Sequence, residues 1–111
     1  MKKINPDIIR LMDMIQAIAD AEECAALASK KELHAACYNI AIIGEAAGKL
    51  TPALCERHND IPWTKITGIR HKIIHDYGKV DATILKQVII DELPGLKQRL
   101  QIILTALSKG A

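Results

Sequence analysis

Phenylalanine is absent from this sequence, and other aromatic residues are scarce. Only Tyr38, Trp63 and Tyr77 are aromatic among 111 residues, and valine occurs twice. Isoleucine, alanine and leucine supply most of the apolar half of the chain, with 18, 15 and 11 copies. A core of aliphatic side chains and small alanines lets helix backbones approach closely, so this inventory favours packed helices.

Long hydrophobic runs are also missing. The run Ile40–Ile43 has four residues, whereas a membrane span needs about 18. At the N-terminus, Lys2 and Lys3 precede Pro6 and Asp7, where a secretory signal would place an apolar segment. We therefore expect a soluble, cytoplasmic protein that makes no use of a membrane.

The chain also has few cysteines and only a small net charge. Cys24, Cys37 and Cys55 are odd in number and scattered, which indicates reduced thiols rather than a disulfide framework. The net charge of +2 is too small to indicate nucleic-acid binding by itself. With a quarter of its residues charged and half apolar, the chain has a globular balance. We expect one domain over 1–111, with its core at about 5–107.

Apolar residues recur at helical spacing through the first half of the chain. Asn5 is a suitable N-cap for a first helix, with Pro6 at its first position. Ser29 opens a second helix with a capping-box sequence. Small residues run beside the apolar stripe of this second helix and would admit another helix closely: Cys37, Ala41, Gly44 and Gly48.

The second half continues the same pattern. Pro62 starts a third helix, for which Gly78 is the expected stop. Asp81 caps a fourth segment, which Pro94 kinks or divides. Because no sustained period-2 alternation occurs, the sequence predicts an all-α, up-and-down bundle of four to five helices.

Cationic side chains gather in the third helical segment. The segment contains one acid, Asp76, and five cationic or titratable basic residues: Lys65, Arg70, His71, Lys72 and His75. On an ideal helix Arg70 lies at the edge of the apolar stripe, and His75 lies about 140° away from it. One straight helix therefore does not bring the two together. Either the helix bends near Gly78 or a second chain completes a site.

A purely structural interpretation of the same residues is available. Arg70 would extend its charge to solvent along the apolar face, and His75 would be an exposed cation near a helix C-terminus. Tyr77 would pack against Trp63 and Ile73 to close the bundle.

The arrangement Arg70-x4-His75-Asp76-Tyr77 resembles the R-x4-H-x-Y motif of the HepT-like family, within the HEPN superfamily of helical RNases. Other segments are similar to elements of that family in order and spacing: Ile42–Ala47 (I-I-G-E-A-A), Ile61–Trp63 (I-P-W), Gly68–Arg70, Val80–Asp81 and Asp91–Pro94. The resemblance runs from about Asp7 to Leu104. One stretch departs from it, because Tyr38–Ala41 replaces the family's Arg-Asn-Leu-Glu.

The resemblance implies a HEPN-like homodimer whose composite cleft cuts single-stranded RNA, mRNA or tRNA, without a metal or other cofactor. It implies Arg70 and His75 as catalytic residues. Three further residues would support these two: Asn39, Glu45 and Asp76. Two lysines, Lys65 and Lys72, would bind RNA phosphates.

The resemblance also implies control by a partner. Such chains are the toxins of toxin–antitoxin pairs, and Tyr77 would accept AMP from an MntA-type minimal nucleotidyltransferase antitoxin. A phosphodiester on Tyr77 would place negative charge where the RNA backbone must bind.

Two alternatives stay open on the sequence alone. Histidine and cysteine pairs at metal-ligand spacing could hold zinc: His34 with Cys37, Cys55 with His58, and His71 with His75. The bundle could also be a non-catalytic module that binds a nucleotide or a nucleotidyltransferase through Arg70 and His75.

Overall fold

The computed structural model describes residues 4–110, so Lys2 and Lys3 lie outside the described residues. Helices dominate this part of the chain, and its only strand-like feature is an isolated antiparallel bridge between Ile74 and Val80. The elements follow in the order α1 (Pro6–Glu23), α2 (Lys30–Gly48), α3 (Pro52–Arg57), α4 (Trp63–Thr67), α5 (Ile69–Ile73), η1 (Asp76–Gly78), α6 (Ala82–Gln87), η2 (Val88–Glu92) and α7 (Leu93–Lys109).

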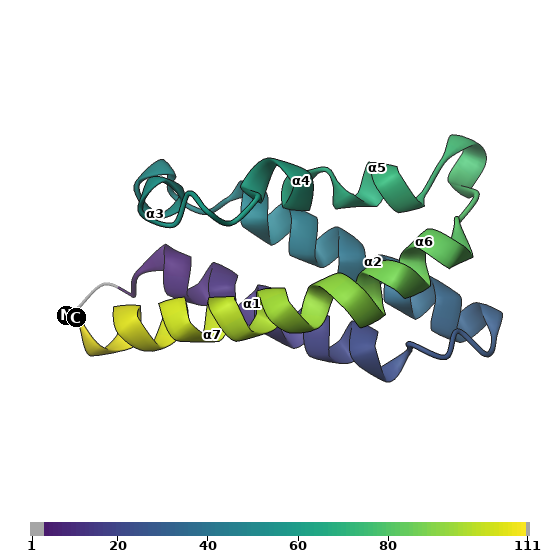
Figure 1. Cartoon of the computed structure of the whole chain (residues 1–111), viewed down its shortest axis with the longest axis horizontal. Coiled ribbons are helices and arrows are strands. Elements are labelled where there is room, and N and C mark those ends of the chain that lie inside the picture. The colour runs from purple at the N-terminus through teal and green to yellow at the C-terminus, as the bar shows by residue number, and fades with distance from the viewer. Residues whose placement is uncertain (1–3, 111) are drawn as a thin grey trace.

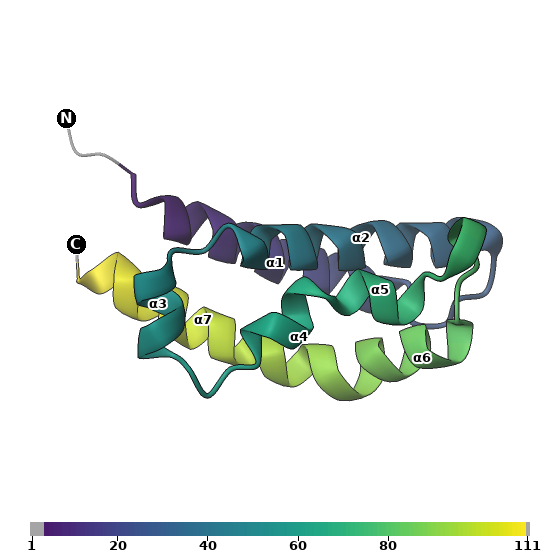
Figure 2. The same ribbon diagram turned by 90° about the horizontal axis from the view of Figure 1, so that it is seen from above.

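The long helices form an elongated antiparallel bundle. Helices α1 and α2 run in opposite directions along one another, and α7 returns along α1 (Figures 1 and 2). The short helices α4 and α5 lie end to end along α2 and form the fourth layer. This arrangement confirms the predicted all-α bundle.

The core is aliphatic, as the composition predicts. Each long helix turns one apolar stripe inward, so that fully buried side chains come from several elements: Leu11, Ile18, Ile40, Ile43, Leu54, Ile73, Leu85, Ile89 and Leu100. Burying a side chain of this size stabilises the fold by about 1.5–3 kcal/mol before the entropy of ordering is subtracted.

Side-chain caps begin the helices where the sequence predicts them. The side chain of Asn5 accepts a hydrogen bond from the Asp7 N–H (2.9 Å), and Ser29 Oγ accepts one from the Glu32 N–H (3.2 Å). Asp81 Oδ1 accepts from the Ile84 N–H at 3.0 Å. Each cap satisfies a donor that the first turn of a helix cannot pair internally.

The prediction of one helix from Pro62 to Gly78 is wrong in two places. The chain breaks between α4 and α5 at Gly68, and α5 ends at Ile73. The Ile74 N–H still bonds the Arg70 carbonyl (2.8 Å), but His75 is extended and bonds Lys79 instead. Pairing with Lys79 and Val80, which follow Gly78 in the chain, therefore ends the helix early.

Pro94 does not divide the last segment. The chain stays helical from α6 into α7, and the turn before the proline widens into the π-helical η2, where the Leu93 N–H donates to the Val88 carbonyl. A wider turn accommodates a proline ring, which would collide with the carbonyl of an α-helical turn.

No helix among residues 4–110 combines the length and the apolar character that crossing a bilayer takes.

Candidate functional site

Gly44 on α2 determines how closely the α4–α5 layer, which carries part of the motif, packs against α2. A Cβ on Gly44 would lie 3.2 Å from the Ile66 carbonyl oxygen and 3.3 Å from that of Thr67. The backbone of α4 thus rests almost directly on α2, as the predicted column of small residues implies. Ile66 of α4 and Ile69 of α5 are both buried in this layer.

Arg70 lies on the exposed surface of α5. Lys72 reaches the other way and forms an ion pair with Glu92 of η2 (3.6 Å). Two residues apart on an ideal helix, the Arg70 and Lys72 side chains leave the axis about 160° apart. The Arg70 guanidinium therefore projects on the side of α5 away from Glu92, and it makes no ion pair or hydrogen bond within residues 4–110.

A tight hairpin follows α5 and holds the rest of the motif. The His75 N–H donates to the Lys79 carbonyl (2.8 Å), and the Gly78 N–H donates to the His75 carbonyl (3.0 Å). Tyr77 sits at the tip with φ of 58°, and Gly78 follows with φ of 76°. Two successive residues in the left-handed region reverse the chain within a few residues.

Tyr77 is fully exposed, with a relative accessibility of 104%. The interpretation that it packs against Trp63 and Ile73 is therefore wrong. The relation of Tyr77 and His75 to Arg70 on one helix is also wrong, because α5 has ended before either residue. Instead, the motif occupies an exposed helix end and the hairpin beyond it.

The supporting residues lie on different elements. Asn39 on α2 donates from Nδ2 to the Ala35 carbonyl (2.9 Å), and Glu45 on the same helix pairs with Lys49 (3.5 Å). Asp76 is exposed in the hairpin, where its carbonyl accepts from the Lys79 N–H. Within residues 4–110, no hydrogen bond or ion pair joins Asn39, Glu45 or Asp76 to the side chains of the motif, so their expected roles remain predictions.

Lys65 and Lys72 line a groove of ≈ 690 Å³ between the α4–α5 layer and α7. Its apolar lining comes mainly from Ile61, Ile66, Ile69, Leu93 and Leu96. Arg70 and His75 do not line this groove. The structure thus places the two lysines on another side of the α4–α5 layer from the arginine.

The described residues contain no group of three or more His, Cys, Asp or Glu side chains that could hold a metal ion. The zinc alternative built on His34, Cys37, Cys55 and His58 is therefore not assembled in the structure. Burial instead raises the pKa of the Cys37 thiol, and burial followed by the charge of Asp7 raises that of Cys55. Both are less reactive thiols than an exposed cysteine.

Asp7 has a buried carboxylate that no sequence pattern indicates. It is 4% exposed and accepts two hydrogen bonds from Thr51, from the N–H to Oδ1 (2.9 Å) and from the hydroxyl to Oδ2 (2.6 Å). An acid in the first turn of a helix is ordinarily accounted for by its favourable interaction with the helix dipole. The role of Asp7 in tying the start of α3 to α1 depends on a contact 44 residues away in sequence.

The fold and motif together define a small helical bundle that presents an arginine, a histidine and a tyrosine from one helix end and its hairpin. The family described as "Ribonuclease HepT-like" matches residues 8–103. The chain therefore belongs to the HepT-like ribonuclease family, which confirms the resemblance.

Individual relatives agree with this assignment. The chain is 30% identical over 108 residues to "Probable ribonuclease HepT" of Thermococcus cleftensis, covering 91% of this chain and 96% of that protein. It is 38% identical over 66 residues to "Putative RNase TTE0752" of Caldanaerobacter subterraneus subsp. tengcongensis, covering 60% of this chain and 59% of that protein. It is 25% identical over 91 residues to "Putative RNase MJ1380" of Methanocaldococcus jannaschii, covering 82% of this chain and 84% of that protein. No solved structure matches the chain significantly.

Proposed function

We propose that this chain is a metal-independent endoribonuclease that cleaves single-stranded RNA as the toxin of a toxin–antitoxin pair. The observation that carries the proposal is the exposed arrangement of Arg70, His75 and Tyr77 at one helix end of a HepT-like chain. In this proposal the active species is a homodimer, and a cognate MntA-type nucleotidyltransferase silences it by adding AMP to Tyr77.

The residue types suit RNA cleavage. His75 removes the proton from a ribose 2′-hydroxyl, whose oxygen then attacks the neighbouring phosphorus. The bond from phosphorus to the 5′-oxygen breaks, and that oxygen gains a proton as it leaves. The products are a 2′,3′-cyclic phosphate and a 5′-hydroxyl.

Arg70 stabilises the charge that builds on the phosphorus oxygens. A planar guanidinium can donate two parallel hydrogen bonds to a phosphate, and a cation without a partner in its own chain is free to do so. The lack of an ion pair for Arg70 among residues 4–110 supports this role.

The proposed homodimer supplies a second imidazole. The reaction needs a base and an acid, and each protomer carries one motif histidine, His75. A two-fold interface that brings both hairpins together would give one cleft both groups.

The first experiment is RNA cleavage in the presence of EDTA. Wild-type protein should produce fragments that end in 2′,3′-cyclic phosphate, and Arg70→Ala and His75→Ala should each lower the rate by about 100-fold or more. Arg70→Lys should also fall well below wild type, because an ammonium lacks the two-pronged donor geometry.

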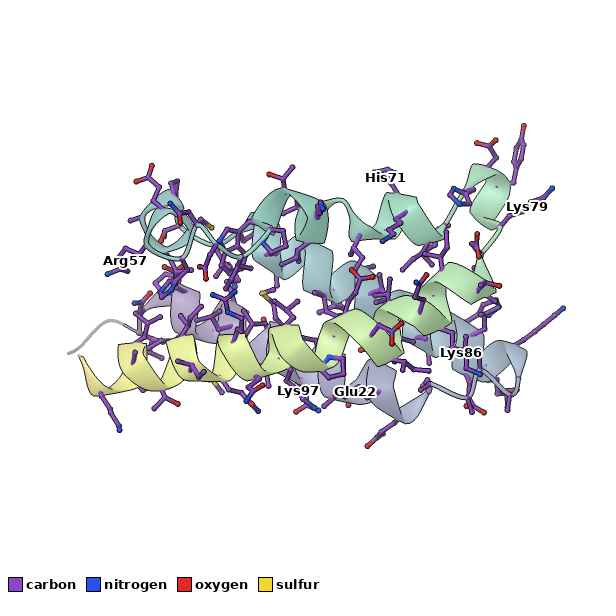
Figure 3. The ribbon with its side chains drawn as sticks, viewed as in Figure 1. Glu22, Arg57, His71, Lys79, Lys86 and Lys97 are labelled. Atoms are coloured by element: carbon purple, nitrogen blue, oxygen red, sulfur yellow. The ribbon has the colours of Figure 1, made fainter. Side chains whose placement is uncertain are left out.

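The matched control is His71→Ala. His71 is an exposed histidine of the same short helix and points away from the bundle (Figure 3). Its loss should leave cleavage unchanged. A wild-type protein that binds a nucleotidyltransferase or ATP but never cuts RNA would support the non-catalytic module instead.

The second experiment addresses Tyr77. After incubation with ATP and the cognate nucleotidyltransferase, the intact mass of the wild type should rise by one or more AMP units and cleavage should stop. Tyr77→Phe should stay unmodified and active. Equal modification and inhibition of Tyr77→Phe would remove the tyrosine as the point of control.

A further inference from the structure

The hairpin that follows α5 sets Lys79 directly opposite His75. The His75 N–H donates to the Lys79 carbonyl, and the Asp81 N–H donates to the Ile73 carbonyl, both at 2.8 Å. These two bonds enclose the antiparallel bridge between Ile74 and Val80. Residues opposite one another in an antiparallel pair have their side chains on the same face.

The face that His75 and Lys79 share is the solvent-facing one. Ile74 and Val80 pack against the core and are half-buried. Side chains alternate along an extended chain, so the next pair, His75 and Lys79, faces away from the bundle. Both residues are exposed, and Figure 3 shows Lys79 extending outward from the hairpin.

The Lys79 ammonium makes no ion pair with an acid anywhere in residues 4–110. Lys72, by contrast, pairs with Glu92. Asp76 meets Lys79 only through the backbone, by accepting the Lys79 N–H at its carbonyl. Lys79 therefore offers an unpaired positive charge on the strand segment that pairs with His75.

We propose that Lys79 binds a phosphate of the RNA strand next to His75 and so helps to hold the reacting ribose at the imidazole. This inference rests on the proposed function and adds a residue that the R-x4-H-x-Y motif does not contain. An anionic group on Tyr77, at the tip of the same hairpin, would compete for the same ammonium.

The experiment compares Lys79→Ala with Lys86→Ala, which removes the same charge from an exposed lysine of α6 (Figure 3). Binding is measured with a single-stranded 2′-O-methyl oligonucleotide, which has no nucleophilic hydroxyl, over a range of salt concentrations. Lys79→Ala should lower the log–log salt slope by about 0.7, the value for one phosphate contact in a single strand. Lys86→Ala should leave the slope unchanged.

Cleavage of unmodified RNA provides the second readout. Lys79→Ala should raise KM several-fold more than Lys86→Ala, and Lys79→Arg should restore KM because it keeps the charge. If Lys79→Ala matches Lys86→Ala in both slope and KM, the inference is overturned while the nuclease stands.

The two proposals can fail separately. A wild type that binds the oligonucleotide but does not cut RNA overturns the nuclease, and the salt slope still tests Lys79. A wild type that neither binds nor cuts overturns both.

Discussion

Tyr77 shows how a single residue shapes the candidate site. A φ of 58° is uncommon for a residue with a side chain, and holding it costs about 1 kcal/mol or more. Gly78 accepts the next positive φ without that cost. The strained tip places the phenol in solvent and sets His75 opposite Lys79, so both consequences bear on the proposed chemistry.

Asp7 is the residue whose loss should matter most to the fold among the acids of α1. Asp7→Ala leaves the Thr51 N–H and hydroxyl without their acceptor, which should lower the free energy of unfolding by about 1–3 kcal/mol. Urea denaturation measures this difference. Asp13→Ala, at an exposed position of the same helix, should change it by about 0.5 kcal/mol or less. Equal effects of the two substitutions would contradict a structural role for the Thr51 contacts.

At the scale of elements, the contact of α2 with α4 depends on the missing side chain of Gly44. Gly44→Val would press a branched side chain onto the carbonyl oxygens of Ile66 and Thr67, where even a Cβ is tight. We expect a loss of about 1–3 kcal/mol in unfolding free energy, as for other overpacked sites. Gly48→Ala is the control, because its new Cβ would meet only Thr67 Cγ2 at 3.8 Å. Thermal melts in which both variants matched the wild type would show that α4 can move away freely.

Local signals explain which elements the sequence predicted. Helix starts depend on a cap and the turn that follows it, so Asn5, Ser29 and Asp81 were identified correctly. The early end of α5 depends on pairing across the hairpin, and nothing within α5 itself signals it. The motif residues could thus be named from the sequence. Their arrangement could not be predicted, because His75 and Tyr77 lie beyond the end of α5 and not on one ideal helix.

The loop between α3 and α4 is tied to α7 by the pair of Asp60 with Arg99. The hydrogen bond from Arg99 lowers the pKa of Asp60 below its usual 3.8. A carboxyl whose pKa is lower in the folded state stabilises the fold above its unfolded pKa, and this contribution is lost as pH falls through the folded value. Asp60→Asn should therefore reduce Tm at a pH of about 7 and have little effect near pH 2.

The control for this pH dependence is Asp91→Asn, which removes an exposed acid that has no ion pair within the described part of the chain. Its effect on Tm should be small at both pH values. A deficit of Asp60→Asn that stayed the same from neutral to acid pH would mean that the pair with Arg99 contributes nothing through its charge.

At the scale of the whole molecule, the small net charge hides an uneven distribution. Helix α1 carries five acids and one base, Asp7, Asp13, Asp20, Glu22 and Glu23 against Arg10. The stretch 63–80 carries four Lys or Arg and two His against one acid, Asp76. A polyanion approaching the molecule is therefore attracted to the α4–α5 layer and its hairpin and repelled from α1.

The proposed homodimer depends on the number of imidazoles in one cleft, because α5 ends before His75 and no single helix relates it to Arg70. Cleavage needs two imidazoles, and each chain carries one motif histidine, His75. Light scattering at micromolar concentration should give twice the mass of one chain. A monomer under those conditions would contradict the composite cleft.

Subunit mixing then tests whether the dimer shares one cleft. When wild-type and His75→Ala chains are mixed equally and exchange freely, wild-type dimers are about one quarter of the total. If each cleft needs both imidazoles, the mixture should keep about one quarter of the activity that wild type shows at the same total chain concentration. Protomers that work alone would keep about one half, because half of the chains still carry His75. The control mixes wild-type chains equally with His71→Ala chains instead. This mixture should keep the full activity, because His71 has no part in the proposed chemistry.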